Sequence, residues 1–162
     1  MAYPESVHDH RHGKPAQSER VLGGVSEHLR ELGVPAITTT DGPSGIRLQY
    51  YTSLLPCGTA LACTWDLSLV ESLSQALGRE MKEKGSDVLL APGMNIHRNP
   101  LCGRNFEYFS EDPLLTGRMA AATVKGIQKN GVAACPKHFA CNNQETNRNQ
   151  NDSRVSQRAL RE

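Results

Sequence analysis

The sequence predicts an α/β fold in which helices alternate with the strands of a parallel sheet. Three observations support this prediction. Apolar residues recur at helical spacing in several segments, short apolar segments stand between them, and glycine or proline ends nearly every segment. Strands joined through helices pair in parallel with right-handed crossovers, so the pattern fits an open doubly wound sheet or part of a (β/α)8 barrel.

The first predicted elements are a helix and a strand. From Ser18, apolar residues recur at helical spacing as far as Leu32, and Gly33 provides a C-terminal cap. A short β-branched strand over 36–40 follows, and an Asp-Gly-Pro sequence beginning at Asp41 turns the chain. Asp41 is therefore expected at the carboxyl end of a strand.

The middle of the chain repeats this order. A helix is expected over 64–85, with Thr64 as its N-cap, and a strand over 87–91. A long polar loop then runs to Asp112, and a helix over 113–129 begins with proline at its first position.

The remaining predicted elements are short. A strand is expected over 132–135, with Lys137 and His138 emerging from its carboxyl end, and a further strand over 60–63. Ser156 has the character of a helix cap, yet only six residues follow it, whereas an isolated helix needs roughly 12 to 15. We therefore expect a piece of a longer protein, with a frayed natural terminus as the alternative.

Composition narrows the class of protein. The 162 residues are 38% hydrophobic and 22% charged, which is typical of a soluble globular protein. A net charge of +1 gives no large single-sign field, which argues against nucleic acid or an anionic membrane as a partner. No run approaches the roughly 20 apolar residues of a membrane span, and the first residues lack the apolar region of a signal peptide.

Five cysteines occur without a C-x-x-C pair, and an odd number cannot all be bridged within one chain. Reduced thiols, and hence a cytoplasmic protein, are the expectation. The cysteines also lack a matched base, which favours buried apolar thiols over nucleophiles. His8, His10 and His12 alternate but have no nearby Cys or fixed acid partner, so we assign no metal and no cofactor.

Three polar clusters follow predicted strands, at 41–43, 103–107 and 137–148. Because parallel α/β folds place ligand sites at the carboxyl ends of their strands, we expect one face of the protein to collect them. A sugar ring needs both hydrogen-bond acceptors and donors. The acceptor is Asp41, and the donors are Arg47, Arg104, Lys137 and Arg148.

Each cluster also has a plainer interpretation. The Asp-Gly-Pro sequence at Asp41 is by itself a turn, Arg104 can form a structural ion pair with Glu107, and His138 can be a hydrogen-bonded, partly buried imidazole. The polar segment 137–148 is the hardest to explain as a linker without function, because it follows a buried strand and lacks the Gly and Ser residues that are typical of flexible linkers. No phosphate-binding glycine pattern is present.

Five sequence blocks together resemble glycoside hydrolase family 3, in its β-glucosidase branch: TTTDGPSGIR, LLPCGTALACTWD, APGMNIHRNPLCGRNFEYFSEDP, KHFACNNQETNR and VSQRALRE. The resemblance covers about Pro35 to Glu162, whereas residues 1–34 match only loosely. We therefore divide the chain into a lead-in segment with a helix over 1–34 and an incomplete N-terminal (β/α)8 barrel domain over 35–162.

The resemblance implies a retaining exo-β-glycosidase that hydrolyses terminal non-reducing β-D-glucosyl residues and whose N-terminal domain is a (β/α)8 barrel. It places Asp41 on the hydroxyls at the far side of the terminal sugar, with Arg47 and Arg104 bracing Asp41 and the same ring edge. The hydroxyls nearer the reactive carbon would be bound by Lys137, His138 and Arg148. All six residues are implied to bind substrate, and none to be catalytic.

The chain departs from the family pattern in one respect. The family's nucleophilic aspartate and acid/base glutamate lie in later regions that these residues do not contain, although a retaining mechanism needs two carboxyl groups roughly 5 to 5.5 Å apart. A complete barrel takes about 250 residues and eight strands, and only three or four strands are predicted here. We expect a fragment that is inactive alone and that associates through its exposed strand edges. Two partners are expected, a β-glucoside or related oligosaccharide and the missing C-terminal part of the parent enzyme.

Two alternatives come from other classes. A non-catalytic carbohydrate-binding or scaffold protein would retain the sugar contacts without the chemistry. A nucleotide-binding α/β domain would need a phosphate loop, which the sequence lacks. The sugar itself stays open, because xylosidases and other branches of the family share much of this pocket.

Overall fold

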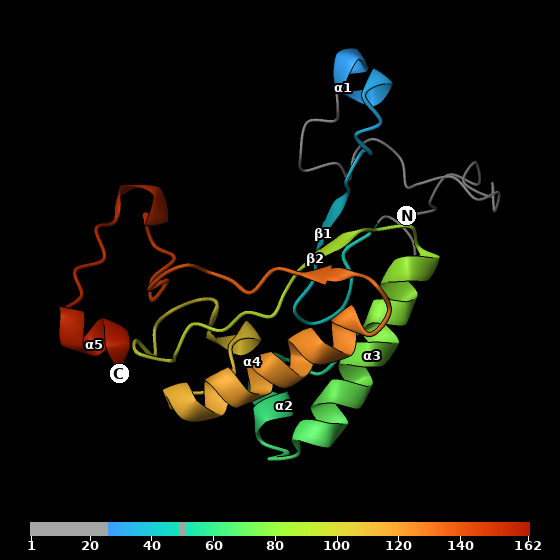
Figure 1. The fold of residues 1–162 in the computed structure, drawn as a ribbon. Coiled ribbons are helices and arrows are strands. Elements are labelled where there is room, and N and C mark those ends of the chain that lie inside the picture. Colours follow the sequence, from blue (N-terminus) through green and yellow to red (C-terminus); the bar gives the residue numbers. More distant parts are fainter. Residues whose placement is uncertain (1–25, 49–50) are drawn as a thin grey trace, which may run out of the picture.

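The computed structural model describes residues 26–48 and 51–162 (Figure 1). Helices and strands alternate through the central part of the chain, as predicted. In chain order the elements are α1 (Glu27–Glu31), β1 (Thr39–Asp41), α2 (Gly58–Ala62), α3 (Leu67–Glu83), β2 (Val88–Leu90), the 3-10 helix η2 (Asn105–Glu107), α4 (Pro113–Gln128), β3 (Ala133–Ala134), the 3-10 helix η3 (Arg148–Gln150) and α5 (Gln157–Arg161).

The strands form a parallel sheet in the order β1-β2-β3. Thr39 is in register with Val88, and Leu89 is in register with Ala134. Strands β2 and β3 lie inside the segments predicted from the sequence, and β1 extends one residue past the predicted 36–40, so that Asp41 is its last residue. The expected parallel sheet, with Asp41 at the carboxyl end of a strand, is confirmed.

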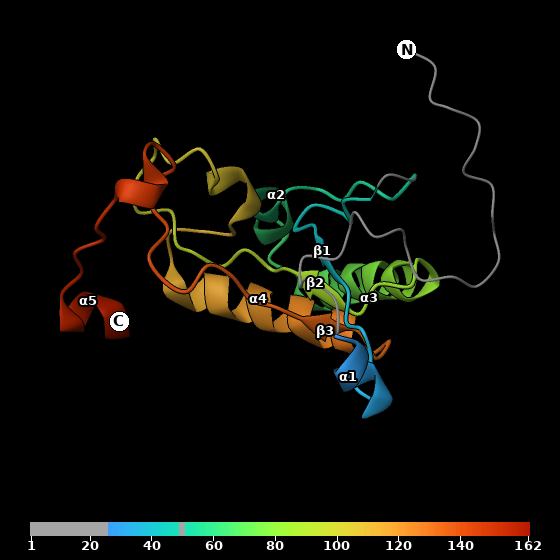
Figure 2. The ribbon, with the colours of Figure 1, turned by 90° about the horizontal axis from the view of Figure 1, so that it is seen from above.

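Helices α3 and α4 lie side by side on one side of this sheet, which is clear both in Figure 1 and from above in Figure 2. Between the helices and the strands lies a core in which Met81, Leu89 and Ile127 are fully buried. A second cluster, including Val70 and Met119, fills the space between α3, α4 and α2. Apolar side chains of the two long helices therefore face each other and the sheet.

The start of α4 at Pro113 is confirmed, whereas the N-cap of α3 is not the residue predicted. Asp112 accepts hydrogen bonds from two backbone N–H groups in the first turn of α4, ahead of Pro113. In α3 the carboxylate of Asp66 accepts from the N–H of Leu69 at 3.0 Å. Thr64 was the wrong choice because its hydroxyl bonds within the preceding turn.

The strand expected over 60–63 is wrong, because this segment lies in α2 and the residue that caps it. The N–H of Leu61 donates to the carbonyl of Cys57 at 3.0 Å, which is a helical hydrogen bond. A run of four small apolar residues fits a strand and a buried helix equally well, since it is too short to show a period. Burial of Leu61 and Ala62 against the second core cluster stabilises the helix.

Helix α1 begins at Glu27, whereas the sequence predicts a helix from Ser18. Ser26 caps it, and the part of the prediction over 18–25 lies outside the described residues, as do His8, His10 and His12. Gly33 closes the helix at φ +78°, and the N–H of Val34 reaches back to the carbonyl of Leu29, which is the hydrogen bonding of a Schellman motif.

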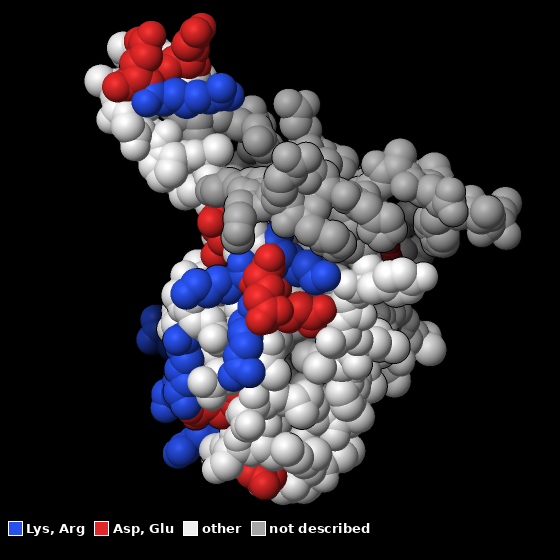
Figure 3. Space-filling view, turned by 90° about the vertical axis from the view of Figure 1, so that its right-hand side faces the viewer, with Lys and Arg blue, Asp and Glu red and all other residues white. Residues whose placement is uncertain are grey.

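The surface carries no extended region of one charge on the face shown in Figure 3, where acidic and basic side chains lie next to one another. Helix α1 buries none of its residues and projects from the body of the protein in Figures 1 and 3. Within 26–48 and 51–162, no helix is both long and apolar enough to cross a bilayer.

Candidate functional site

Asp41 and Lys137 form the centre of the candidate site. They are 96 positions apart in the sequence, yet Nζ of Lys137 donates to Oδ1 of Asp41 at 2.5 Å. Arg47 approaches the other carboxylate oxygen at 3.5 Å and is itself well exposed. Burial raises the pKa of the Asp41 carboxyl, but the hydrogen bond and charge of Lys137, together with Arg47, outweigh burial and leave that pKa below its ordinary value.

The backbone around Lys137 continues the sheet beyond β3. The N–H of Lys137 donates to the carbonyl of Pro92, and the carbonyl of Lys137 accepts from the N–H of Met94 at 2.7 Å. These bonds form a parallel bridge between Gly93 and Lys137. The side chain of Lys137 is only 13% exposed, so the sheet itself directs the ammonium group towards the end of β1.

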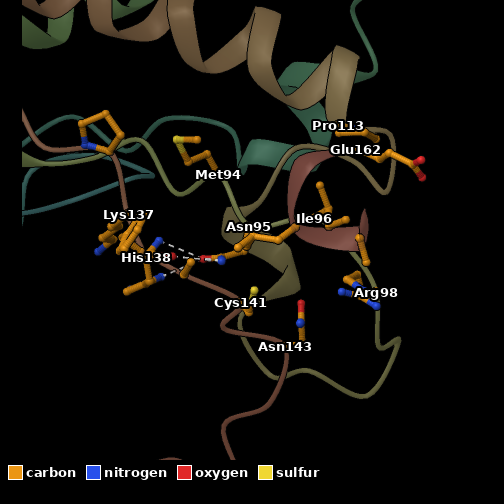
Figure 4. A pocket seen from close by; sticks show the side chains of 15 residues that line it. Met94, Asn95, Ile96, Arg98, Pro113, Lys137, His138, Cys141, Asn143 and Glu162 are labelled. Carbon is orange, nitrogen blue, oxygen red and sulfur yellow. Dashed lines mark hydrogen bonds between the residues drawn. The ribbon is translucent and has the colours of Figure 1, made fainter. Parts of the chain in front are cut away.

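His138 is held through its backbone and its ring. The amide of Asn95 accepts from the N–H of His138 at 2.8 Å and donates to its carbonyl at 3.1 Å (Figure 4). The ring atom Nδ1 lies 3.0 Å from the hydroxyl of Tyr108. Burial, aided by the positive charges of Arg104 and Lys137, lowers the pKa of His138 to about 4, so the imidazole is neutral at pH 7.

Arg104 forms the structural ion pair that the plainer interpretation proposed. Its guanidinium contacts Oε1 of Glu107 through Nε at 2.6 Å and through Nη2 at 2.5 Å, and Glu107 is buried. The same guanidinium lies 3.9 Å from Glu145. Arg104 is thus fixed by buried and partly buried carboxylates, while its charge still reaches His138.

Arg148 lies at the exposed end of this network. Its Nη1 is 3.2 Å from Oε2 of Glu145, and 56% of the side chain is exposed. Glu145 also accepts from Asn142 at 2.9 Å, and Asn142 donates to the hydroxyl of Tyr108. The structure therefore connects Arg148 to Arg104 and His138 through carboxylate, amide and phenol groups, and not directly to Asp41.

Two pockets adjoin these residues. The first, of about 360 Å³, is lined by Lys137 and His138 and by apolar side chains that include Phe139. Figure 4 shows Lys137 and His138 on one side of it and Pro113 and Glu162 on the other. The second pocket, of about 370 Å³, is lined by Arg47. Among the described residues, the six candidates therefore form connected clusters but do not all line one cavity.

Three residues that organise the site were given no role from the sequence, although Glu145 lies within the polar cluster 137–148. Asn95 fixes the backbone of His138, Tyr108 contacts its ring, and Glu145 joins Arg104 to Arg148. Tyr108 stands between Phe106 and Phe109 in the sequence, where an aromatic residue suggests core packing. The signal for Tyr108 was its hydroxyl, because a buried phenol usually has a hydrogen-bond partner.

The described residues hold no group of three or more His, Cys, Asp or Glu side chains placed to bind a metal ion. All five cysteines lie in this part of the chain and are free thiols. The site therefore consists of hydrogen-bonding groups, with fixed cations, a carboxylate of lowered pKa and a neutral imidazole. Such a set suits a ligand that is neutral and rich in hydroxyl groups.

Comparison with known proteins decides the family. The model of the glycosyl hydrolase family 3 N terminal domain matches residues 10–162. The chain belongs to glycosyl hydrolase family 3. It is 58% identical over 143 residues to a beta-glucosidase of Ruminococcus albus, a match that covers 87% of the chain and 15% of that relative. It is 52% identical over 139 residues to beta-glucosidase A of Butyrivibrio fibrisolvens, covering 83% of the chain and 17% of that relative.

Solved structures of beta-glucosidases share the fold. A beta-glucosidase from Paenibacillus barengoltzii superposes with a TM-score of 0.82 at 56% identity, covering 85% of this chain and 15% of that one. Beta-glucosidase 3B from Thermotoga neapolitana, solved in complex with glucose, gives a TM-score of 0.72 at 55% identity, covering 74% of this chain and 18% of that one. This family 3 chain thus spans less than a fifth of the length of these relatives.

Proposed function

We propose that this chain supplies the sugar-binding part of a retaining exo-β-glycosidase that hydrolyses terminal non-reducing β-D-glucosyl residues. The observation that carries the proposal is the Asp41–Lys137 pair, which joins the ends of β1 and β3 and has neutral His138 beside it. Support comes from the relatives that are named beta-glucosidases and from the Thermotoga enzyme solved with glucose.

The charges suggest a role for each group. Asp41 stays ionised at neutral pH, so it accepts hydrogen bonds from two neighbouring sugar hydroxyls. Lys137 holds that carboxylate in place and donates its remaining hydrogens to the sugar. Arg47 and Arg104 add donors at the ring edge, and His138 and Arg148 bind hydroxyls nearer the anomeric carbon. A neutral sugar is favoured over an anion because Asp41, Glu107 and Glu145 offset the cations.

We also propose that β1, β2 and β3 are consecutive strands of a (β/α)8 barrel. The parallel order β1-β2-β3, with α3 and α4 on one side of the sheet, is the arrangement that a barrel repeats around its axis. The candidate residues follow the carboxyl ends of these strands, where barrels place their active sites.

The catalytic carboxylates would come from sequence outside residues 1–162. Retaining hydrolysis needs one carboxyl group as nucleophile and another as acid and base, roughly 5 to 5.5 Å apart. Glu107 is occupied by Arg104, and Glu145 bridges Arg104 and Arg148, so both serve as structural partners of cations here. We therefore assign no catalytic residue within this chain.

The decisive experiment uses purified chain 1–162 with glucose and with an aryl β-glucoside. We expect saturable glucose binding by calorimetry and no turnover. Asp41→Asn should weaken binding at least tenfold, since it removes a charge-assisted acceptor worth about 1.5 to 3 kcal/mol. The matched control is Asp152→Asn, which changes an exposed pair with Arg154.

Each outcome bears on a different part of the proposal. Turnover of the aryl glucoside would overturn the assignment of the catalytic carboxylates to other sequence. Absence of glucose binding by a cooperatively folded chain would overturn the sugar site itself. Binding without turnover, if it persisted when the chain was joined to the family's remaining regions, would favour the non-catalytic carbohydrate-binding alternative.

We propose a cytoplasmic location for the protein, supported by its five free thiols. Cys63 and Cys135 are exposed and would be the first to oxidise in a secreted protein. Alkylation of intact cells should label both thiols, whereas recovery of either in a disulfide would contradict the proposed location.

A further inference from the structure

The tautomer of His138 decides what this residue offers to a ligand. A neutral imidazole carries one proton, so Nε2 is a donor when the proton is there and an acceptor when the proton is on Nδ1. His138 lines the first pocket, and within the described part of the chain no protein atom bonds to its Nε2. The groups around Nδ1 therefore set the chemistry at Nε2.

The orientation of the Asn142 amide gives the first step. Its Nδ2 lies 2.9 Å from Oε1 of Glu145 and 2.9 Å from the hydroxyl of Tyr108. An ionised carboxylate only accepts hydrogen bonds, so the group facing Glu145 is the NH2 and not the carbonyl oxygen. The second hydrogen of the same NH2 is then donated to the oxygen of Tyr108.

Tyr108 gives the second step. Its side chain is fully buried, and burial raises the pKa of its phenol to about 12, so the hydroxyl keeps its proton. Its oxygen already accepts from Asn142, and the phenolic proton needs an acceptor of its own. The one acceptor that the described residues provide is Nδ1 of His138, at 3.0 Å.

Asn95 is the competing partner, because its Oδ1 lies 3.2 Å from the same Nδ1 and would favour a proton there. That oxygen already accepts the backbone N–H of His138 at the shorter distance of 2.8 Å. A proton on Nδ1 would leave the buried hydroxyl of Tyr108 without an acceptor, which is costly in a protein interior. The hydrogen bonds that link Glu145, Asn142 and Tyr108 to Nδ1 therefore favour a proton on Nε2 of His138.

The charges that face His138 keep it neutral, so that the tautomer matters at physiological pH. Arg104 and Lys137 disfavour a second proton, whereas Glu145 and Asp41 act in the opposite direction and more weakly. We propose that Tyr108 is a positioning residue that fixes neutral His138 with its proton on Nε2, so that His138 presents a hydrogen-bond donor to a sugar hydroxyl.

The test uses the 162-residue chain labelled with 15N. Long-range 1H–15N spectra at pH 7 distinguish a protonated Nε2 from a protonated Nδ1, and comparison with His138→Gln assigns the signals. We expect Nε2–H in the unmodified chain. Tyr108→Phe removes the phenolic donor and leaves Nδ1 facing Asn95, so the proton should move largely to Nδ1. Tyr51→Phe, at a position 97% exposed, should change nothing.

An Nδ1–H form in the unmodified chain, or an unchanged tautomer in a folded Tyr108→Phe chain, would overturn the proposal. The unmodified spectrum alone decides the tautomer, so failure of the variant to fold does not remove the test. The role at a sugar rests on the proposed function, but the tautomer is measured without sugar. If glucose binds, Tyr108→Phe should weaken it about fivefold, the usual size of one lost hydrogen bond. Absence of binding together with Nε2–H would contradict the sugar site alone.

Discussion

His138 makes the stability of the protein depend on pH. The folded pKa is about 4, below the ordinary 6.5, because burial and the neighbouring cations disfavour the charged ring. Between these pH values the unfolded chain binds more protons than the folded chain, so the free energy of unfolding should fall as the pH drops from about 6.5 to about 4.

Urea denaturation at pH 7 and pH 5 measures this slope. His138→Gln should flatten it, while His28→Gln should leave it in place, since His28 lies on α1 with 78% of its side chain exposed. Equal slopes in the unmodified chain and in His138→Gln would show that the burial of His138 does not couple to folding.

Lys137 determines the acidity of Asp41. Lys137→Met removes the 2.5 Å hydrogen bond and the nearest positive charge, leaving burial and the more distant Arg47. The pKa of the Asp41 carboxyl should therefore rise, as followed by 13C NMR titration. Lys129→Met, which removes the exposed pair with Glu71 on the helical surface, is the control and should leave Asp41 unchanged.

The pairing of Lys137 with Asp41 also affects the stability of the protein at low pH. A folded pKa below the ordinary 3.8 gives stability that is present above that value and is lost as the pH falls through the folded pKa. Lys137→Met should reduce this contribution, so its acid unfolding should begin at a higher pH than that of the unmodified chain. Identical acid transitions would mean that Lys137 and Asp41 are paired in the unfolded chain as well.

At the scale of elements, two glycines in α4 test how closely α3 and α4 approach. A methyl group on Gly126 would lie 2.3 Å from the carbonyl oxygen of Glu71 and 2.6 Å from the β-carbon of Ser74. Gly117, in the same helix, has no atom within 4 Å of that position. A substitution at Gly126 therefore tests the packing of α3 against α4, whereas a substitution at Gly117 tests helix propensity alone.

Gly126→Ala should destabilise the protein by about 1 to 3 kcal/mol, because the two helices must move apart. Gly117→Ala should stabilise it by up to about 1 kcal/mol through better helix propensity. Chemical denaturation of both variants measures the difference. Similar stability changes in the two variants would mean that α3 and α4 do not make this close contact in solution.

The elements show where sequence reasoning succeeds. Strands β2 and β3 and helices α3 and α4 were placed because each has an apolar pattern with a cap or a breaker at its ends. The segment 60–63 was misassigned because four residues show no period and the packing of α2 against α4 decided the outcome. The cap of α3 was missed by two residues because Thr64 and Asp66 are both capable caps, and only the geometry of the turn selects between them.

At the scale of the molecule, the topology predicted that the clusters at Asp41 and Lys137 lie on one face of the protein, but not that the two side chains are paired. Asp41 ends one parallel strand and Lys137 comes shortly after another, so the sheet brings them together although 96 positions separate them. The sequence did not predict the route from Arg148 to His138, which runs through Glu145, Asn142 and Tyr108. Side-chain orientation in a loop depends on contacts with other loops, and neither spacing nor composition encodes these contacts.

The whole molecule should also associate at high concentration. Phe139 is 104% exposed and Leu101 is 90% exposed, and β3 forms the edge of a parallel sheet, a type normally covered on both faces. A net charge of +1 provides little repulsion between copies of the chain. Sedimentation velocity should therefore show a weight-average mass that rises with protein concentration.

Leu101→Ser should shift this rise to higher concentration, because it removes a large apolar side chain from an exposed loop. Asn151→Ser, an exposed polar exchange, should leave it unchanged. If the chain instead remained monomeric over the whole range, the exposed apolar side chains and the open edge of β3 would not be enough to drive contact. In that case a free three-stranded sheet would be stable by itself.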